Sequence, residues 1–254
     1  MEKYKVNDAH VHIGKSSGVL IDTSPDDITK YIDQHNLENI LLMSLDENVN
    51  QNNKIIGEMA KNDKRIHGLY WIQKNQIDFD VKCLSQGLNE KKYVGVKFHG
   101  AFEHLPPTSE VYKPIMEVLS KNNACILIHC GRYNDGSRSS VTSFEYALEL
   151  ATNYPQINII LAHMGGNDTS IVKKAVSYAV GIDNVYFDTS GISTPVRVEV
   201  ALRSGLSSDR ILFGSDAMWC SFLGNYYNLV DARISEEDKN KIFYDNFKKV
   251  IMKK

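Results

Sequence analysis

The sequence predicts a single α/β domain over residues 1–254, folded as a (β/α)8 barrel. Short apolar runs and helix-like segments alternate eight times along the 254 residues, which is the order of a barrel of parallel strands. The length is also that of one such barrel. No glycine-rich G-x-G-x-x-G stretch follows the first strand, which argues against an open dinucleotide-binding sheet.

The eight expected strands are short and mostly apolar. The first stops at Gly14, and the second, residues 40–43, contains no polar residue, which is typical of a strand buried on both faces. The strands are expected at residues 4–13, 40–43, 66–72, 93–99, 125–129, 157–163, 185–188 and 210–216.

The expected helices lie between these strands. The helix over residues 24–36 has the clearest start, because Ser24 suits the N-cap and Pro25 suits the first helical position. Asp26 and Asp27 then face the positive end of the helix. The remaining helices are expected at residues 55–61, 79–90, 109–121, 144–152, 169–180, 195–206 and 236–252.

The composition excludes several classes of partner. Lys and Arg total 29 against 31 Asp and Glu, so the formal net charge of −2 gives no field that attracts nucleic acid or an anionic membrane. No apolar run approaches a transmembrane span and no signal segment precedes the first strand, so we expect a cytoplasmic protein. The four cysteines form no C-x-x-C pair and are expected to be reduced. The expected partner is a small-molecule substrate. The oligomeric state, including a homo-oligomer, is left open.

The stretch Asp8-Ala9-His10-Val11-His12 suggests a metal site. In a strand, side chains alternate between faces, so Asp8, His10 and His12 are expected on one face. Neutral imidazole is the commonest ligand of divalent transition metals in proteins. A His-x-His pair alone is weak support, and the rest must come from later in the chain.

Further ionisable residues end other strands. In a barrel the carboxyl ends of the strands converge on one mouth, where active sites are found, so residues distant in sequence become neighbours. The candidates are His10, His12, Lys97, His99, His129, His163 and Asp216. We expect His35, His67 and His104 to be structural or surface residues.

These residues lie in motifs that follow one another along nearly the whole chain: DAHVH at 8–12, GVKFH at 95–99, IHCG at 128–131, LAHMGG at 161–166 and FGSD at 213–216. The ordered set resembles the amidohydrolase superfamily. More narrowly, it resembles the amidohydrolase-2 family, which includes aminocarboxymuconate semialdehyde decarboxylase and related enzymes.

The resemblance implies that one divalent metal is held by His10, His12, His129 and Asp216. Zn²⁺ is expected first and Mn²⁺ is the alternative. It also implies that His163 hydrogen-bonds the metal-activated water. Such an ion lowers the pKa of water toward neutrality, and Asp216 can take the water's proton and deliver it to the leaving group.

Lys97 has two interpretations. In two-metal relatives a carbamylated lysine at the end of the fourth strand bridges the ions, with His129 and His163 holding the second metal. The other interpretation is a protonated Lys97 that binds a substrate carboxylate or carbonyl oxygen together with His99. We favour the one-metal site.

Other residues near these motifs are candidates for substrate binding. Arg132 and Arg138 follow the fifth strand, where a guanidinium fork can clamp a carboxylate. Trp219 and Phe222 follow Asp216 and are expected to wall the pocket or to belong to the core.

The function expected first is a metal-dependent hydrolase acting on a small carbonyl compound such as an amide, lactone or ester. The alternative, implied by the resemblance, is a metal-dependent non-oxidative decarboxylase of an aromatic or muconate-type acid. A barrel that binds a ligand without chemistry is disfavoured, since every ligand type is present.

Overall fold

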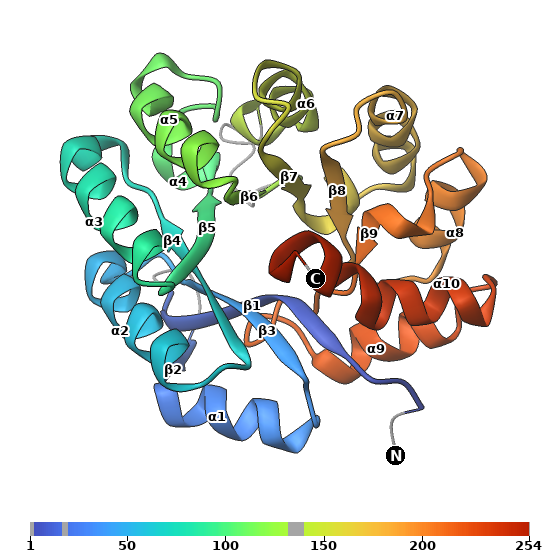
Figure 1. The fold of residues 1–254 in the computed structure, drawn as a ribbon. Coiled ribbons are helices and arrows are strands. Elements are labelled where there is room, and N and C mark those ends of the chain that lie inside the picture. The colour runs from blue at the N-terminus through green and yellow to red at the C-terminus, as the bar shows by residue number, and fades with distance from the viewer. Residues whose placement is uncertain (1–2, 17–19, 132–139, 254) are drawn as a thin grey trace.

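The computed structural model describes residues 3–16, 20–131 and 140–253. Parallel strands curl around the centre of the molecule and helices surround them (Figure 1). Each of the eight strands of the ring pairs in parallel with the next strand of the ring. The eight strands are β1 (Asn7–Lys15), β3 (Asn39–Ser44), β4 (Ile66–Trp71), β5 (Tyr93–Phe98), β6 (Cys125–Ile128), β7 (Asn158–Leu161), β8 (Val185–Asp188) and β9 (Ile211–Leu212).

The segment that follows β9 returns to β1 and closes the ring. The Ala9 N–H donates to the Phe213 carbonyl at 2.8 Å, and the Asp216 N–H donates to the His10 carbonyl at 2.9 Å. A parallel bridge between Val11 and Ala217 continues this seam. The predicted eight-stranded barrel is therefore confirmed.

The helices cover the outer face of the barrel near the expected positions. α1 begins as predicted: the Ser24 side chain accepts from the Asp27 N–H, and the Asp27 carboxylate accepts from the Ser24 N–H. No helix in the described ranges is long and apolar enough to cross a bilayer. The helices with expected counterparts are α1 (Pro25–Gln34), α2 (Val49–Asn62), α3 (Ile77–Asn89), α5 (Lys113–Asn122), α6 (Phe144–Asn153), α7 (Thr169–Ala179), α8 (Val196–Arg203) and α10 (Glu236–Asn240).

α2 begins six residues earlier than predicted. The prediction missed its first turns because polar residues fill the buried face there. The Asn53 side chain exchanges two hydrogen bonds with the backbone of Trp71, and the Asn52 side chain donates to the hydroxyl of Ser44. The apolar periodicity that predicts a helix is therefore missing from the first two turns.

Apart from short 3-10 turns, one strand and two helices of the described residues have no counterpart in the prediction. β2 (Asp22–Thr23) pairs antiparallel with the end of β1, α4 (Gly100–Glu103) is a single turn after β5, and α9 (Phe222–Val230) follows β9.

The apolar core has two parts. One lies between the strands and the helices, and the other fills the barrel interior with side chains such as Leu41, Leu69 and Leu127. Two π-helical turns, Lys241–Asp245 and Lys248–Met252, continue from α10, and Phe247 and Val250 pack into the interior cluster. This C-terminal segment lies across the barrel end that faces the viewer in Figure 1, so it covers the amino-terminal mouth.

Candidate metal and active site

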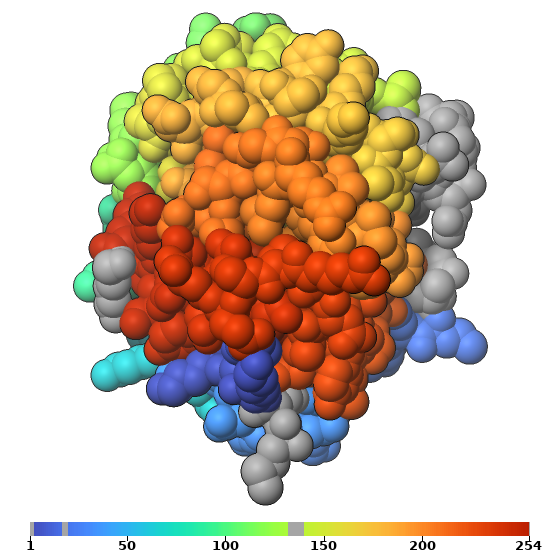
Figure 2. Space-filling view, turned by 90° about the vertical axis from the view of Figure 1, so that its right-hand side faces the viewer, coloured from blue at the N-terminus to red at the C-terminus, as the bar shows by residue number. Residues whose placement is uncertain are grey.

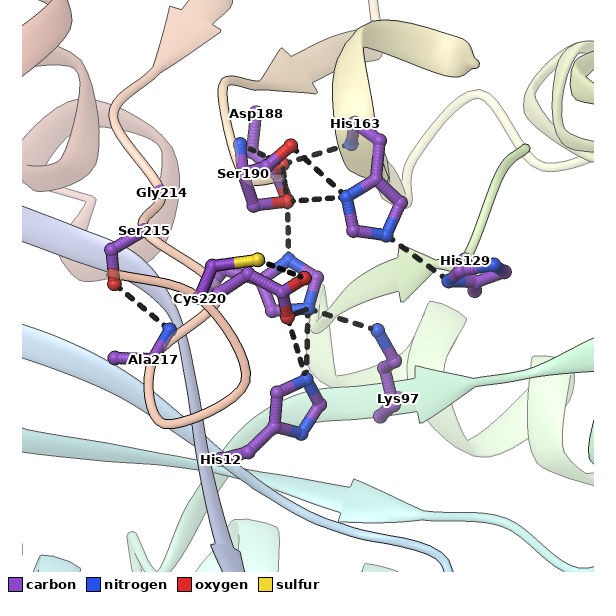
Figure 3. Close-up of polar contacts among 12 residues, drawn as sticks. His12, Lys97, His129, His163, Asp188, Ser190, Gly214, Ser215, Ala217 and Cys220 are labelled. Carbon is purple, nitrogen blue, oxygen red and sulfur yellow. Dashed lines mark hydrogen bonds and ion pairs between the residues drawn. The ribbon is translucent and has the colours of Figure 1, made fainter. Parts of the chain in front are cut away.

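The residues expected at the strand ends meet at the carboxyl-terminal mouth, opposite the covered end. Figure 3 shows His12, Lys97, His129 and His163 among them. They come from five strands: His10 and His12 lie in β1, Lys97 lies in β5, His99 follows β5, His129 follows β6, His163 follows β7 and Asp216 follows β9.

β1 contains a bulge. Asp8 pairs with Ile40 and Val11 pairs with Leu42, so two residues, Ala9 and His10, stand opposite one residue of β3. Ala9 packs inside the barrel, whereas Asp8 points toward α1, where the Tyr31 hydroxyl donates to its Oδ2 at 2.5 Å. The prediction that Asp8 shares a face with His10 and His12 is therefore wrong, because the bulge breaks the period of two.

The hydrogen bonds of His10 and His12 fix the tautomer of each ring. Nδ1–H of His10 donates to Asp188 Oδ2 and Nδ1–H of His12 donates to the Ser44 carbonyl, each at 2.9 Å. A carboxylate and a carbonyl only accept, so Nδ1 carries the proton and Nε2 carries a lone pair. Burial, followed by the charge of Lys97, lowers the pKa of His10 to about 4, which keeps this ring neutral at pH 7.

Asp216 brings an oxygen to the same point. The Nε2 atoms of His10 and His12 lie 3.1 Å apart, and Asp216 Oδ1 lies 3.5 Å and 3.2 Å from them. Burial opposes the charge of this carboxylate. The protonated forms of the neighbouring histidines, His10 first, would outweigh that effect and hold the pKa of Asp216 below its usual range.

The three residues fit a divalent metal. Their ligand atoms all lie within 4.8 Å of one another. Each atom presents a lone pair toward the same point, which is the arrangement of ligands around a cation. Two imidazole nitrogens and a carboxylate suit Zn²⁺ or Mn²⁺, whereas Ca²⁺ prefers oxygen ligands.

A second chain of hydrogen bonds orients His163 and His129. Nδ1–H of His163 donates to the Ser190 carbonyl at 3.0 Å, which leaves a lone pair on Nε2. That Nε2 lies 3.1 Å from Nδ1 of His129 and accepts its proton. Nε2 of His129 is then a fourth lone pair, buried and without a hydrogen-bond partner among the described residues. His129 lies outside the three-residue group, so its role as a metal ligand stays a prediction.

Lys97 is buried beside this group. Its side chain is 1% exposed, and Nζ lies 3.3 Å from Nε2 of His10. Burial lowers the pKa of Lys97 to about 8, and the carboxylates of Asp216 and Asp188 work in the opposite direction. Lys97 thus places a cation beside the metal group at neutral pH.

His99 and His129 stack in parallel. Their ring centroids lie 3.9 Å apart at an interplanar angle of 11°, and Trp71 stacks on His99 at 5.7 Å and 9°. Burial, followed by neighbouring charges, lowers the pKa of both histidines well below the usual value, so both are neutral. The stack holds the plane of the His129 ring.

Three residues at this mouth have strained backbone conformations. His163, Met164 and Asp216 have φ angles of 57°, 57° and 61°, in the left-handed region that residues other than glycine rarely adopt. Such conformations persist where the surrounding structure fixes them, and they cluster at functional sites.

The sequence matches a protein-family model. The family model Amidohydro_2, described as amidohydrolase, matches residues 44–250.

The chain belongs to this amidohydrolase family.

Solved structures extend the similarity over the first strand of this amidohydrolase, which the family match does not include. A dihydroxybenzoic acid decarboxylase from a Polaromonas species, with bound manganese and the inhibitor 2-nitroresorcinol, has a TM-score of 0.79 at 17% identity, covering 98% of this chain and 97% of that chain. A 2,6-dihydroxybenzoate decarboxylase from Rhizobium has a TM-score of 0.78 at 18% identity, covering 99% of both chains.

A third structure is 5-carboxyvanillate decarboxylase from Novosphingobium aromaticivorans, with manganese and 4-hydroxy-3-methoxy-5-nitrobenzoic acid. Its TM-score is 0.79 at 12% identity, covering 98% of this chain and 96% of that chain. No curated protein matches the amidohydrolase significantly. At these identities the solved structures establish the barrel fold.

Sequence reasoning missed Asp188 in this amidohydrolase. Its Oδ2 accepts from His10, while its Oδ1 accepts from the backbone N–H groups of His163 and Ser190 and from the Ser190 hydroxyl. One carboxylate therefore ties a candidate metal ligand to His163. The signal that could have identified Asp188 was its position at the carboxyl end of the seventh strand of the ring. The other candidates also lie at carboxyl ends of strands.

The predicted substrate-binding residues have different outcomes. Phe222 is buried among Tyr31, His35 and Phe213, so it belongs to the core and not to a pocket wall. The side chain of Trp219 is 44% exposed, and its contact with a substrate stays a prediction. Arg132 and Arg138 lie outside the described residues.

Proposed function

We propose that this amidohydrolase is a divalent-metal-dependent decarboxylase of a hydroxylated aromatic carboxylic acid. The chain is an enzyme of the amidohydrolase superfamily. The observation that carries the proposal is that solved proteins sharing its fold over 98–99% of its length decarboxylate dihydroxybenzoate or 5-carboxyvanillate. The sequence favoured hydrolysis first, and these comparisons support the alternative at least as well.

His10, His12 and Asp216 would hold the metal. We propose His129 as the fourth ligand from the family resemblance, and its buried Nε2 has no hydrogen-bond partner among the described residues. When bound, the ion supplies positive charge that stabilises negative charge on substrate oxygens. We propose Mn²⁺ or Zn²⁺, because mixed nitrogen and oxygen ligands accept both ions. Two of the three similar structures contain manganese.

Asp216 would move the proton. Its pKa lies below the usual range, so the free carboxylate is an acceptor. In the proposed reaction it takes the proton of a substrate hydroxyl group and gives it to the ring carbon that bears the carboxylate. The bond to the carboxylate then breaks, carbon dioxide leaves, and the electron pair returns through the ring to the phenolate oxygen.

Lys97 and His99 would hold the substrate carboxylate. Lys97 is the buried cation closest to the metal group in the described ranges, and His99 follows it by two residues at the same mouth. Charge-assisted hydrogen bonds in a buried site fix the orientation of a carboxylate. The proposal leaves Lys97 free of carbamylation, since a carbamate would remove this cation.

A substrate panel tests the proposal. Purified protein loaded with Mn²⁺ or Zn²⁺ is incubated with 2,6-dihydroxybenzoate, 5-carboxyvanillate, small lactones and small amides. Carbon dioxide release and hydrolysis are followed separately. We expect carbon dioxide from an aromatic acid, released at least about 10²-fold more slowly by the Asp216→Asn variant. Turnover of lactones or amides with no release of carbon dioxide from any acid would overturn the proposal and restore hydrolysis.

A further inference from the structure

The side chain of Cys220 contacts Asp216. Its thiol donates to Asp216 Oδ2 with a sulfur–oxygen distance of 3.7 Å, and its backbone N–H donates to the Asp216 carbonyl at 2.7 Å (Figure 3). The two oxygens of Asp216 therefore have different surroundings. Oδ1 faces the imidazoles of His10 and His12, and Oδ2 faces the thiol.

The thiol acts as a donor here and is not one of the clustered ligand atoms. Cys220 is absent from the group whose ligand atoms lie within 4.8 Å of one another, although cysteine sulfur qualifies for such a group. An ordinary thiol has a pKa of about 8.5 and is therefore protonated at neutral pH, so the S–H group is available to donate.

Oδ2 also lies near the backbone of Gly191. Gly191 lies there with φ of +61°, and a Cβ atom on it would come within 3.5 Å of Oδ2 and 3.0 Å of His163 Nδ1. No side chain of residue 191 can therefore hold this oxygen. Rotation about the terminal bond of an aspartate is soft, so an oxygen without a partner is poorly fixed.

We propose that Cys220 is a positioning residue for Asp216. Its S–H group holds Oδ2, and this fixes Oδ1 toward the point where the two Nε2 atoms converge. The inference rests on the proposed metal site and deepens it, because it assigns to a residue of this chain the orientation of a metal ligand and proton carrier. Partners of metal ligands commonly set metal affinity in this way.

The other cysteines provide a contrast. Cys125 is buried in the barrel interior, where its thiol donates to the Val94 carbonyl, and Cys83 is partly exposed on α3. Among the hydrogen bonds of the described residues, the thiol of Cys220 is the one that reaches a candidate ligand. Cys83 therefore serves as a matched control.

The test separates hydrogen bonding from packing. Cys220→Ser keeps a donor of similar size, Cys220→Val fills the space without a donor, and Cys83→Ser removes a thiol remote from the site. The Mn²⁺ dissociation constant of each purified variant is measured by electron paramagnetic resonance, with no substrate present. kcat and KM are then compared on the substrate that the panel identifies.

We expect Cys220→Val to weaken Mn²⁺ binding by about tenfold, at the lower end of the range for partners of metal ligands because a thiol is a weak donor. kcat should fall with little change in KM, and Cys220→Ser should stay within about threefold of the parent in Mn²⁺ affinity. Cys83→Ser should leave affinity and kcat unchanged.

Equal Mn²⁺ affinity in the parent, Cys220→Ser and Cys220→Val would overturn the positioning role while leaving the metal site intact. A loss in Cys220→Ser with retention in Cys220→Val would assign the effect to packing and also overturn it. Failure of the parent protein to bind Mn²⁺ or Zn²⁺ would overturn the metal site itself, and the positioning role with it.

Discussion

Nδ1–H of His10 donates to Oδ2 of Asp188 over 2.9 Å, and both side chains are almost fully buried. This bond leaves the lone pair of His10 on Nε2, where the metal group converges. Asp188 also receives the backbone N–H of His163 on its other oxygen. A change at Asp188 should therefore disturb two functional histidines together.

We expect Asp188→Asn to reduce metal affinity by roughly 10- to 100-fold, the range for partners of metal-ligating histidines. The amide nitrogen of Asn cannot accept, so either His10 or the backbone at His163 loses its acceptor. Isothermal titration with Zn²⁺ measures the change. Asp183→Asn, a substitution in the loop that precedes β8, is the control, and equal affinity in the two variants would contradict the role of Asp188.

His10 and His12 should be required for metal binding. Each presents an Nε2 lone pair to the same point, so His10→Ala or His12→Ala should remove about one equivalent of ion per chain. Metal analysis of purified protein measures this. His67→Ala, at the amino-terminal end of β4, should keep the metal. Full occupancy in a His10→Ala/His12→Ala double variant would refute the assignment.

Asp216→Asn should lower turnover by at least about 10²-fold, since a positioned acid–base group contributes ~10²–10⁴-fold. The asparagine oxygen can still face a metal, so substrate binding should change less than kcat. Steady-state kinetics on the substrate found by the panel measures both quantities. Near-parental turnover with metal bound would mean that another group moves the proton.

Lys97→Met should stabilise the fold while weakening substrate binding. The folded-state pKa of about 8 lies below the ordinary 10.5, so the buried ammonium costs stability at pH values below about 8, on the order of 3 kcal/mol. This cost is lost as the pH rises from about 8 toward 10.5. The stability advantage of Lys97→Met over the parent should therefore be largest at pH 7 and shrink with rising pH. Urea unfolding at pH 7, 8.5 and 10 measures it, and a pH-independent difference would argue against a buried charge at Lys97.

Gly191→Ala should impair catalysis through crowding. Its Cβ would lie 3.0 Å from His163 Nδ1, so the His163 ring must move. Gly205→Ala is the matched control, because Gly205 also has a left-handed φ, of +96°, but has open space around its Cβ position. Both should lose about 1–2 kcal/mol of stability from backbone strain, and only Gly191→Ala should lose turnover, by about tenfold or more. Equal kcat values for the two variants would mean that Gly191→Ala acts through backbone strain alone and not through crowding of His163.

The sequence predicts the ring of eight strands because most strands are short apolar runs that alternate with helical segments, a signal that depends on local composition. The convergence of His10, Lys97, His163 and Asp216 follows once the ring is assumed, since every residue at a carboxyl-terminal strand end faces the same mouth. These parts of the structure can be predicted without knowledge of side-chain contacts.

Other features depend on interactions that the sequence does not display. The bulge after Asp8 reflects pairing with β3, and the buried Asn52 and Asn53 conceal the first turns of α2. Asp188 resembles any polar residue that ends a strand until its partners are known. Phe222 follows Asp216 closely in sequence, but it turns into the core because α9 packs beside α1.

The metal group lies on the seam where the two ends of the sheet join. Asp8 and Ser215, hydrogen-bonded to each other, are 207 positions apart in the chain, and His10 and Asp216 meet across the same junction. An ion held there would stabilise the closed barrel, because it binds only when the first and last strands are docked. The measured metal affinity would then report whether the first and last strands are paired. A substitution anywhere along the barrel that loosens the seam should be visible as weaker metal binding before the helices or the rest of the sheet unfold.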